Sequence, residues 1–138
     1  MIDRDRILAR LDQVEGYLRE LGDIAPPTFE EYLDPRTRRA CERLLQIAIE
    51  GVLDTAALLV RGLNLGLPQD EDDLLTRLTQ AGVITSELEE KLRKMKGLRN
   101  ILVHEYGRVD DRIVYEVIRT RLGDFDEFKR AVLTRLSP

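Results

Sequence analysis

The sequence has almost none of the residues that build disulfides and zinc sites. It contains one cysteine, Cys41, and one histidine, His104, among 138 residues. A single cysteine excludes an intramolecular disulfide and a cysteine metal cluster. Structural zinc sites take about four Cys or His ligands, so a zinc site built by this chain alone is not expected. We therefore expect no metal and no other cofactor.

Long hydrophobic runs are absent as well. The longest uninterrupted apolar stretch runs from Ala56 to Val60, far below the roughly 20 residues that cross a bilayer. The first six residues alternate in charge and do not form the apolar core of a secretory leader. We therefore expect a cytoplasmic protein with no membrane partner.

An excess of basic charge is also missing. The chain has 22 Lys and Arg against 26 Asp and Glu, a net charge of -4. Proteins that coat nucleic acid need many phosphate contacts from a basic surface, so the net charge argues against that class. It does not exclude an enzyme that binds a few phosphates in a cleft. With 43% hydrophobic and 35% charged residues, the chain has the composition of a folded protein, and its length fits one domain over 1–138.

What the sequence does contain is helical periodicity, with no pattern typical of strands. Apolar spacing, capping residues and glycines predict helices over about 3–21, 34–63, 70–81 and 86–107, a short turn over 28–32, and two further segments starting at 110–111 and after 123–124. Ser86 and Glu89 resemble a capping box. From Leu44 to Val60 the long helix is apolar on nearly every face, which predicts a place at the bundle centre or at an interface. The predicted fold class is all-α, an antiparallel bundle of about five to six helices around a long hydrophobic central helix.

Packing alone does not explain Arg99. On a helical wheel it lies in the middle of an apolar face of the segment 86–107, whose other members are Leu88, Leu92, Met95, Leu102, Val103 and Tyr106. A guanidinium on such a face is costly unless it is paired or faces a cleft. The alternative is an arginine whose stem packs while its head reaches solvent. We favour a functional role.

His104 follows Arg99 by five residues. Five steps of ~100° place the two side chains some 140° apart on a straight helix, so their heads cannot meet within one undistorted chain. Either the helix kinks or ends near His104, with Gly107 just beyond, or a second subunit brings the pair together. By itself, a lone histidine is more often structural than catalytic.

The spacing of these residues changes that judgement. The string from Gly97 to Tyr106 contains the pattern R-x4-H-x-Y and resembles the signature of HEPN-domain toxins of the HepT-like family, the branch paired with minimal nucleotidyltransferase antitoxins. The resemblance extends from about Arg39 to the C-terminus. Its flanking parts are Leu45–Glu50 with Asp54, Ala81–Ile84, Asp110-Asp111 and Ile113–Tyr115.

The resemblance implies the toxin of a type II/VII-like toxin–antitoxin pair, a homodimer whose two motif copies line a shared cleft and cut RNA without a metal. RNA and not DNA is the expected substrate, because the 2′-hydroxyl attacks the adjacent phosphorus. His104 would carry protons, since imidazole gives and takes them near neutral pH. Arg99 would bind the phosphate oxygens. The expected product is a 2′,3′-cyclic phosphate. The apolar long helix also favours a dimer.

Tyr106 has two interpretations. It is seven residues past Arg99, within ~20° of the same helix face, so a plain interpretation makes it a core aromatic. The resemblance instead implies that its phenol accepts AMP from the antitoxin, which would place negative charge beside Arg99 and compete with the RNA phosphate.

Several neighbours are candidate supporting residues. Asn100 would orient His104 or bind RNA, or else is a solvated position. On the long helix, Gln46, Glu50 and Asp54 form the one polar stripe; they would hold Arg99 or tune His104, or else face solvent. A cluster of arginines would steer RNA or is simply a solvated face: Arg36, Arg38, Arg39 and Arg43.

Two other functions were weighed against the ribonuclease. A non-catalytic helical module that scaffolds a nucleotidyltransferase is the main alternative, although a scaffold has no need of arginine, histidine and tyrosine together. A metal-dependent nuclease is disfavoured, because the acidic residues sit at predicted helix starts, where carboxylates favour the helix dipole without a metal. They are Asp70, Asp72, Asp73, Asp110 and Asp111.

Overall fold

The computed structural model describes residues 1–138 and consists of helices and connecting turns. Its elements in chain order are α1 (Arg4–Ile24), α2 (Phe29–Tyr32), α3 (Pro35–Gly62), α4 (Glu71–Gln80), α5 (Ser86–His104), a 3₁₀ turn (Tyr106–Arg108), α6 (Asp111–Thr120) and α7 (Gly123–Leu136). The all-α prediction is confirmed. There are seven helices and not five or six, because the four-residue α2 forms a helix of its own.

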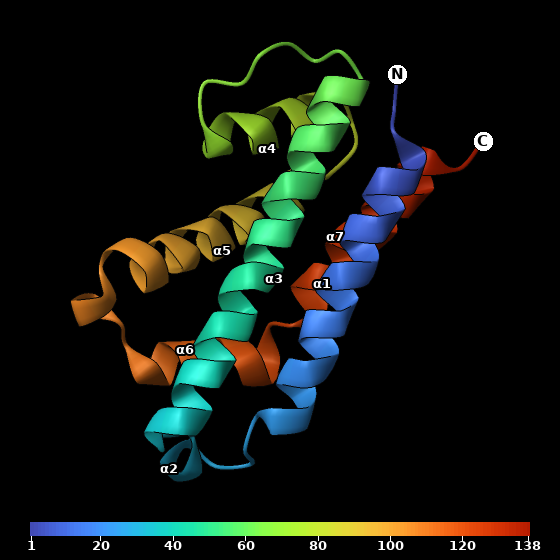
Figure 1. Cartoon of the computed structure of the whole chain (residues 1–138). Coiled ribbons are helices and arrows are strands. Elements are labelled where there is room, and N and C mark those ends of the chain that lie inside the picture. Colours follow the sequence, from blue (N-terminus) through green and yellow to red (C-terminus); the bar gives the residue numbers. More distant parts are fainter.

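The long helix α3 is the centre of the molecule, as predicted. It runs antiparallel to α1, while α4 and α5 lie on its other side and α6 and α7 pack behind (Figure 1). The α1–α3 contact is close at Gly51, where a Cβ atom would lie 2.5 Å from Cγ2 of Val14. The two termini lie near each other, and Arg4 at the start of α1 donates a hydrogen bond of 2.8 Å to the Leu136 carbonyl of α7.

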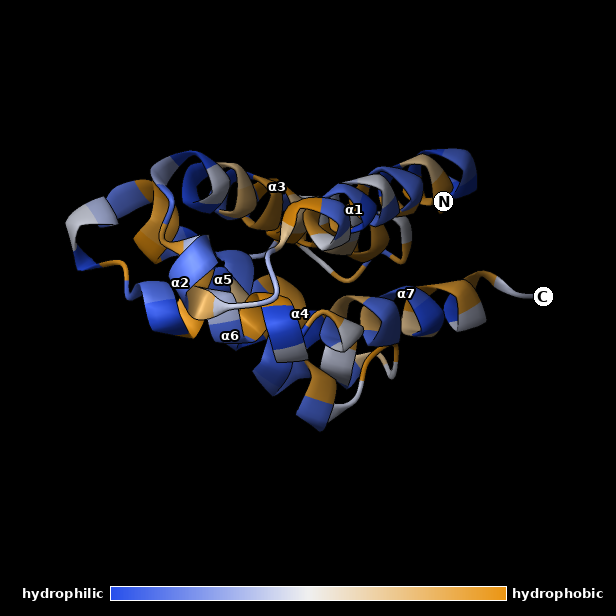
Figure 2. Ribbon diagram, turned by 90° about the horizontal axis from the view of Figure 1, so that it is seen from below, coloured by the Kyte–Doolittle hydropathy of each residue, from blue (hydrophilic) through white to orange (hydrophobic).

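Twenty-eight buried apolar residues form one hydrophobic core, to which all seven helices contribute. In Figure 2 the hydrophobic residues lie on the faces that the helices turn toward one another, and hydrophilic residues cover the outside. Two polar residues of α3 are buried with them, Glu42 and Thr55. No helix of the chain has both the length and the apolar content of a membrane span.

The predicted starts of the helices are largely confirmed. Asp34 caps α3 by accepting a hydrogen bond of 3.1 Å from the Thr37 amide, and Pro35 occupies the first helical position. The predicted cap of α5 is wrong by one residue. Thr85, and not Ser86, accepts the hydrogen bond from the Leu88 amide, at 3.1 Å.

Two predicted helix ends are wrong. α1 continues past Gly22 to Ile24. It ends there because Pro26 forces the preceding Ala25 into an extended conformation. α5 ends at His104, three residues before Gly107, because Glu105 leaves the helical region with φ −131° and ψ 47°.

The expected surplus of apolar surface on α3 is not present. None of the exposed large hydrophobic residues belongs to this helix, because α1 covers one side of it and α4 and α5 cover another. Two of the seven exposed large hydrophobic residues, Val103 and Tyr106, lie at the end of α5 and just beyond it.

Candidate active site

Helix α5 positions Arg99. Its buried residues Leu88, Leu92, Met95 and Leu102 hold one face of the helix against the core. Arg99 extends from this region toward α3 and α4, and its side chain is only 13% exposed. The head of Arg99 therefore does not reach out to solvent, which removes the simplest structural explanation for an arginine at this position.

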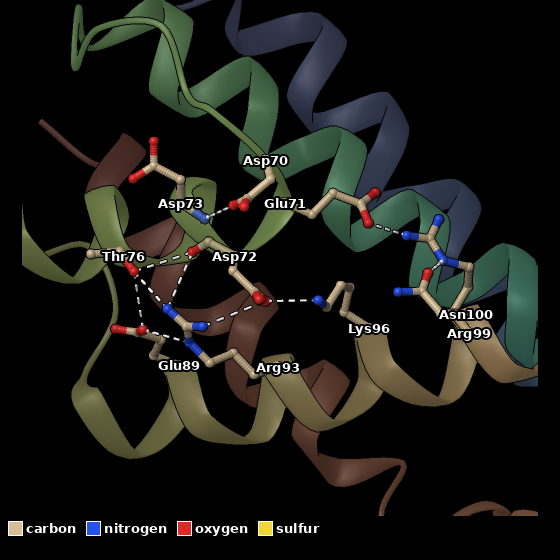
Figure 3. Close-up of polar contacts among 10 residues, drawn as sticks. All are labelled: Asp70, Glu71, Asp72, Asp73, Thr76, Glu89, Arg93, Lys96, Arg99 and Asn100. Carbon is tan, nitrogen blue, oxygen red and sulfur yellow. Dashed lines mark hydrogen bonds and ion pairs between the residues drawn. The ribbon is translucent and has the colours of Figure 1, made fainter.

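Three side chains surround the Arg99 guanidinium. Its Nη2 is paired with the carboxylate of Glu71, which lies in the first turn of α4. Its Nη1 lies 3.8 Å from Oε2 of Glu50 on α3, and its Nε donates a hydrogen bond of 3.0 Å to Oδ1 of Asn100. Figure 3 shows Glu71 and Asn100 reaching the guanidinium from different directions. Gln46 in turn donates to Glu50 at 3.1 Å.

These contacts show which supporting residues lie beside Arg99. Asn100 accepts a hydrogen bond from Arg99 and forms none with His104. Glu50 also belongs to the surroundings of Arg99. Asp54, by contrast, is exposed one turn further along α3 and lines a separate shallow groove with Arg6, Arg10 and Arg61. The structure therefore does not bring Asp54 to Arg99.

A polar network next to Arg99 fixes α4 against α5 (Figure 3). Asp72 of α4 lies 3.0 Å from Nζ of Lys96 and 3.5 Å from Nη1 of Arg93, both on α5. Arg93 also donates hydrogen bonds of 2.6 Å to Thr76 and 2.8 Å to Glu89. Because Glu71 precedes Asp72 in the chain, this network determines where the Glu71 carboxylate lies relative to Arg99.

The acidic residues at the helix starts cap backbone amides or form ion pairs with basic side chains. Asp70 accepts a hydrogen bond of 2.7 Å from the Asp73 amide, and Asp110 accepts bonds of 3.0 and 3.3 Å from the amides of Arg112 and Ile113. The chain contains no group of three or more His, Cys, Asp and Glu side chains placed to hold a metal ion.

His104 is the last residue of α5 and is exposed. Its side chain makes no hydrogen bond or ion pair within the chain, and it is not among the partners of Arg99. Within one chain the structure does not bring Arg99 and His104 together, as the helical spacing predicts.

Tyr106 lies where the helical wheel did not place it. Because α5 has ended, Tyr106 belongs to the 3₁₀ turn and does not share a helix face with Arg99. Its side chain is 49% exposed, so it is not a core aromatic. Its hydroxyl donates a hydrogen bond of 2.8 Å to Oε1 of Glu42 on α3. This bond, with partial burial and the charge of Glu42, raises the pKa of Tyr106, while the nearby Arg39 and Arg38 oppose the shift.

The hydroxyl of Tyr106 borders a shallow groove of about 380 Å³ between α3 and the end of α5. We call it the tyrosine groove; its lining residues are Arg39, Glu42, Arg43, Gln46, Leu102 and Tyr106. Of the four clustered arginines, Arg39 and Arg43 line it, whereas Arg38 lies 3.8 Å from Asp111 and Arg36 is exposed outside it.

Sequence reasoning missed Glu42 and Glu71. Glu42 had a detectable signal, because it is a charged residue in helical phase with the apolar Leu45 and Ile49, all three of which are buried. Glu71 had none, because it lies 28 residues from Arg99 in the chain and only the packing of α4 on α5 brings them together.

Comparisons with known proteins show the family to which the chain belongs. The family model described as Ribonuclease HepT-like matches residues 14–132. A Shewanella oneidensis protein named mRNA nuclease HepT is 42% identical over 84 residues, which are 61% of this chain and 63% of that protein, slightly under two thirds of its length. An Aphanizomenon flos-aquae protein named tRNA nuclease HepT is 27% identical over 127 residues, 91% of this chain and 86% of that protein.

The fold is also that of solved HEPN toxins. The tri-AMPylated Shewanella oneidensis HEPN toxin, solved in complex with MNT antitoxin, superposes with a TM-score of 0.87 at 29% identity, covering 93% of this chain and 96% of that one. A toxin–antitoxin structure with AMP-PNP gives a TM-score of 0.88 at 28% identity, covering 94% and 98%. By sequence and by fold, the chain belongs to the ribonuclease HepT-like family of HEPN toxins.

Proposed function

We propose that this chain is the toxin of a toxin–antitoxin pair and acts as a metal-independent endoribonuclease through Arg99 and His104. The observation that carries the proposal is a guanidinium held by Glu50, Glu71 and Asn100 and followed, at the end of the same helix, by an imidazole with no partner. Membership of the ribonuclease HepT-like family supports it.

The proposed reaction uses the two groups for different tasks. His104 transfers a proton. It either takes the proton of the 2′-hydroxyl that attacks the phosphorus or gives one to the departing 5′-oxygen, because imidazole can do either near neutral pH. Arg99 presents a rigid fork of N–H donors to the phosphate oxygens as negative charge grows on them. The products are a 2′,3′-cyclic phosphate and a 5′-hydroxyl.

The proposal includes a homodimer, because one chain directs the two groups to different sides of α5. Val103 and Tyr106, 41% and 49% exposed, supply apolar surface on either side of His104. A second copy that docks on Val103 and leaves the Tyr106 hydroxyl accessible would bring its own Arg99 or His104 into the same cleft.

The nucleotidyltransferase antitoxin is the proposed second partner, and Tyr106 the residue to which it transfers AMP. Two observations support this: the phenol is half-exposed, and the similar Shewanella oneidensis toxin is described as tri-AMPylated and in complex with MNT antitoxin. Incubation with a cognate nucleotidyltransferase and ATP should add the mass of one or more adenylates at Tyr106. An unchanged intact mass would contradict this part of the proposal.

The central experiment compares the wild type with His104→Ala and Arg99→Lys on total RNA in the presence of EDTA. We expect a loss of cutting on the order of 10²- to 10⁴-fold for His104→Ala, because positioned proton transfer is worth that much. Lys94→Ala, a change at an exposed position of the same helix, should cut normally. Equal and absent cutting by all proteins would favour the scaffold alternative, and dependence on a metal would contradict the metal-free mechanism.

Mixing the two inactive variants tests the dimer. If each site takes Arg99 from one subunit and His104 from the other, a heterodimer of Arg99→Lys and His104→Ala contains one intact site and regains part of the wild-type rate. If each subunit supplies both groups, mixing restores nothing.

A further inference from the structure

The tyrosine groove contains an acid and two arginines that the proposed ribonuclease reaction does not use. Glu42 is only 6% exposed. The hydroxyl of Tyr106 donates to its carboxylate at 2.8 Å, and no Lys or Arg side chain forms an ion pair with it. A buried carboxylate without a cationic partner is costly. Its position under the phenol therefore calls for an explanation other than stability.

The two arginines lie at the mouth of the same groove. Arg39 and Arg43 are exposed residues of α3, and neither forms an ion pair with a carboxylate of the chain. Their guanidinium groups are therefore available to an anionic ligand, and guanidinium forks suit phosphate oxygens. The groove thus combines a nucleophilic hydroxyl, a base in contact with it and cations beside it.

We infer that the tyrosine groove receives the adenylate: Glu42 accepts the Tyr106 proton during transfer, and Arg39 and Arg43 then bind the transferred phosphate. This inference rests on the proposed modification of Tyr106. In the step, Tyr106 Oη forms a bond to the α-phosphorus of ATP held by the nucleotidyltransferase, and the bond from that phosphorus to the bridging oxygen breaks. Pyrophosphate leaves with the electron pair, and the phenol proton passes to Glu42.

The need for a base follows from the state of the phenol. The hydrogen bond to Glu42 raises the pKa of Tyr106 above its ordinary value of 10.0, so almost none of the hydroxyl is ionised at neutral pH. The neutral phenol becomes acidic only as its oxygen bonds to phosphorus. A carboxylate already in hydrogen-bond contact with that oxygen can take the proton at this moment without moving.

The product state explains the two arginines. Once Tyr106 carries a phosphodiester, its oxygen has no proton to donate to Glu42, and the new negative charge is repelled by that carboxylate. The phosphodiester therefore leaves the carboxylate and moves toward Arg39 and Arg43 at the mouth of the groove. There the adenylate phosphate pairs with the two arginines, which an RNA strand approaching the end of α5 would otherwise contact.

Glu42→Gln tests the proton transfer, because it keeps the shape and an acceptor oxygen but removes the base. Single-turnover adenylylation with the cognate nucleotidyltransferase and ATP is followed by intact mass between pH 7 and 9.5. We expect a rate about 100-fold below wild type at pH 7, with a gap that narrows as pH rises, because phenolate formation then replaces the base.

The other groups near Glu42 do not change over this pH range. Burial raises the pKa of the Cys41 thiol to about 11 and raises the pKa of Tyr32 well above its usual value, so both stay protonated. Guanidinium groups in proteins do not lose their proton in this pH range. A rate lowered by the same factor at every pH, or a rate equal to wild type, would overturn the role of Glu42. A wild type that gains no mass would instead contradict the proposed function itself.

A second measurement tests the arginines and does not depend on the Glu42 variant folding. The Arg39→Gln/Arg43→Gln double variant is adenylylated, and removal of AMP by a phosphodiesterase is timed. We expect removal on the order of tenfold faster than from the modified wild type, because the phosphate is no longer held. Arg36→Gln, on the same helix but outside the groove, should match wild type. Equal rates in all three proteins would overturn the binding role.

Discussion

Replacing Glu71 by glutamine should make the protein less stable and yet improve its use of RNA. The Glu71 carboxylate is paired with Arg99, the group proposed to bind the scissile phosphate. A guanidinium that is already neutralised must leave, or share, its carboxylate when a phosphate arrives. Glu71→Gln removes this competitor but leaves Glu50 and Asn100 to hold Arg99 in place.

The size of both effects follows from the exposure of the pair. The Glu71 side chain is 39% exposed, so solvent screens the interaction, and its contribution is about 1 kcal/mol or less. The loss should lower the melting temperature by about 4 °C in a domain of this size. In the variant, the phosphate no longer has to displace a carboxylate that holds Arg99 with ~1 kcal/mol, which corresponds to a KM for RNA about fivefold lower.

The assay is initial-rate cleavage of a defined single-stranded RNA, well below the melting temperature. Glu127→Gln is the matched control, because it also removes one acidic partner from an ion pair, with Lys91 at 2.9 Å and a 35% exposed glutamate, but touches nothing near Arg99. Its KM should stay at the wild-type value. If Glu71→Gln raises KM or leaves it unchanged, Glu71 does not compete with the phosphate.

Two further predictions concern the packing of the core. Gly51→Ala should lower the free energy of unfolding by about 1–3 kcal/mol, because the new Cβ would meet Cγ2 of Val14 at 2.5 Å. Gly97→Ala, in the interior of α5 with nothing within 4 Å of the new atom, should raise it by about 0.5–1 kcal/mol; urea unfolding of both variants checks the opposite signs. Burial raises the pKa of Cys41 from 9.0 to about 11, and the residue is fully buried, so its thiolate fraction at pH 8 is about 100-fold below that of an ordinary thiol. Iodoacetamide should therefore label Cys41 only after unfolding or at much higher pH, and rapid labelling of the native protein at pH 8 would contradict the described burial.

The helices were predictable because local signals suffice for them. Asp34 and Pro35 mark the start of α3, where Asp34 accepts a hydrogen bond from the amide of Thr37, three residues on, and the apolar run that follows predicts a buried helix. The predicted helix ends were wrong where a contact distant in the chain, or a local constraint other than a glycine, determines where the helix stops. At Gly22 the glycine is tolerated inside α1, and the actual stop is the constraint that Pro26 places on Ala25.

The candidate site was predictable in its residues but not in its contacts. Arg99 could be found from the sequence alone, because a charged residue on an apolar helix face is unusual. Its partner Glu71 could not, because the pairing depends on how α4 packs on α5. The position of Tyr106 does not follow from a helical wheel because the helix ends before it, and its partner Glu42 lies 64 residues away in the chain.

The end of α5 at His104 divides the site into a half whose side chain is held by contacts and a half whose side chain is not. Arg99 lies inside the helix, nearly buried, with three partners that set its orientation. His104 is the final residue before Glu105 turns the chain away, and nothing in its own chain sets the direction of its ring. Proton transfer needs a ring fixed within hydrogen-bond reach of its oxygen, so an isolated chain lacks that precision. A neighbouring subunit or the RNA itself must supply the missing contacts. If a neighbouring subunit supplies them, as in the proposed dimer, a chain that stays monomeric at assay concentration should cut RNA far more slowly, and the rate per chain should rise with protein concentration; a rate per chain independent of concentration would contradict this.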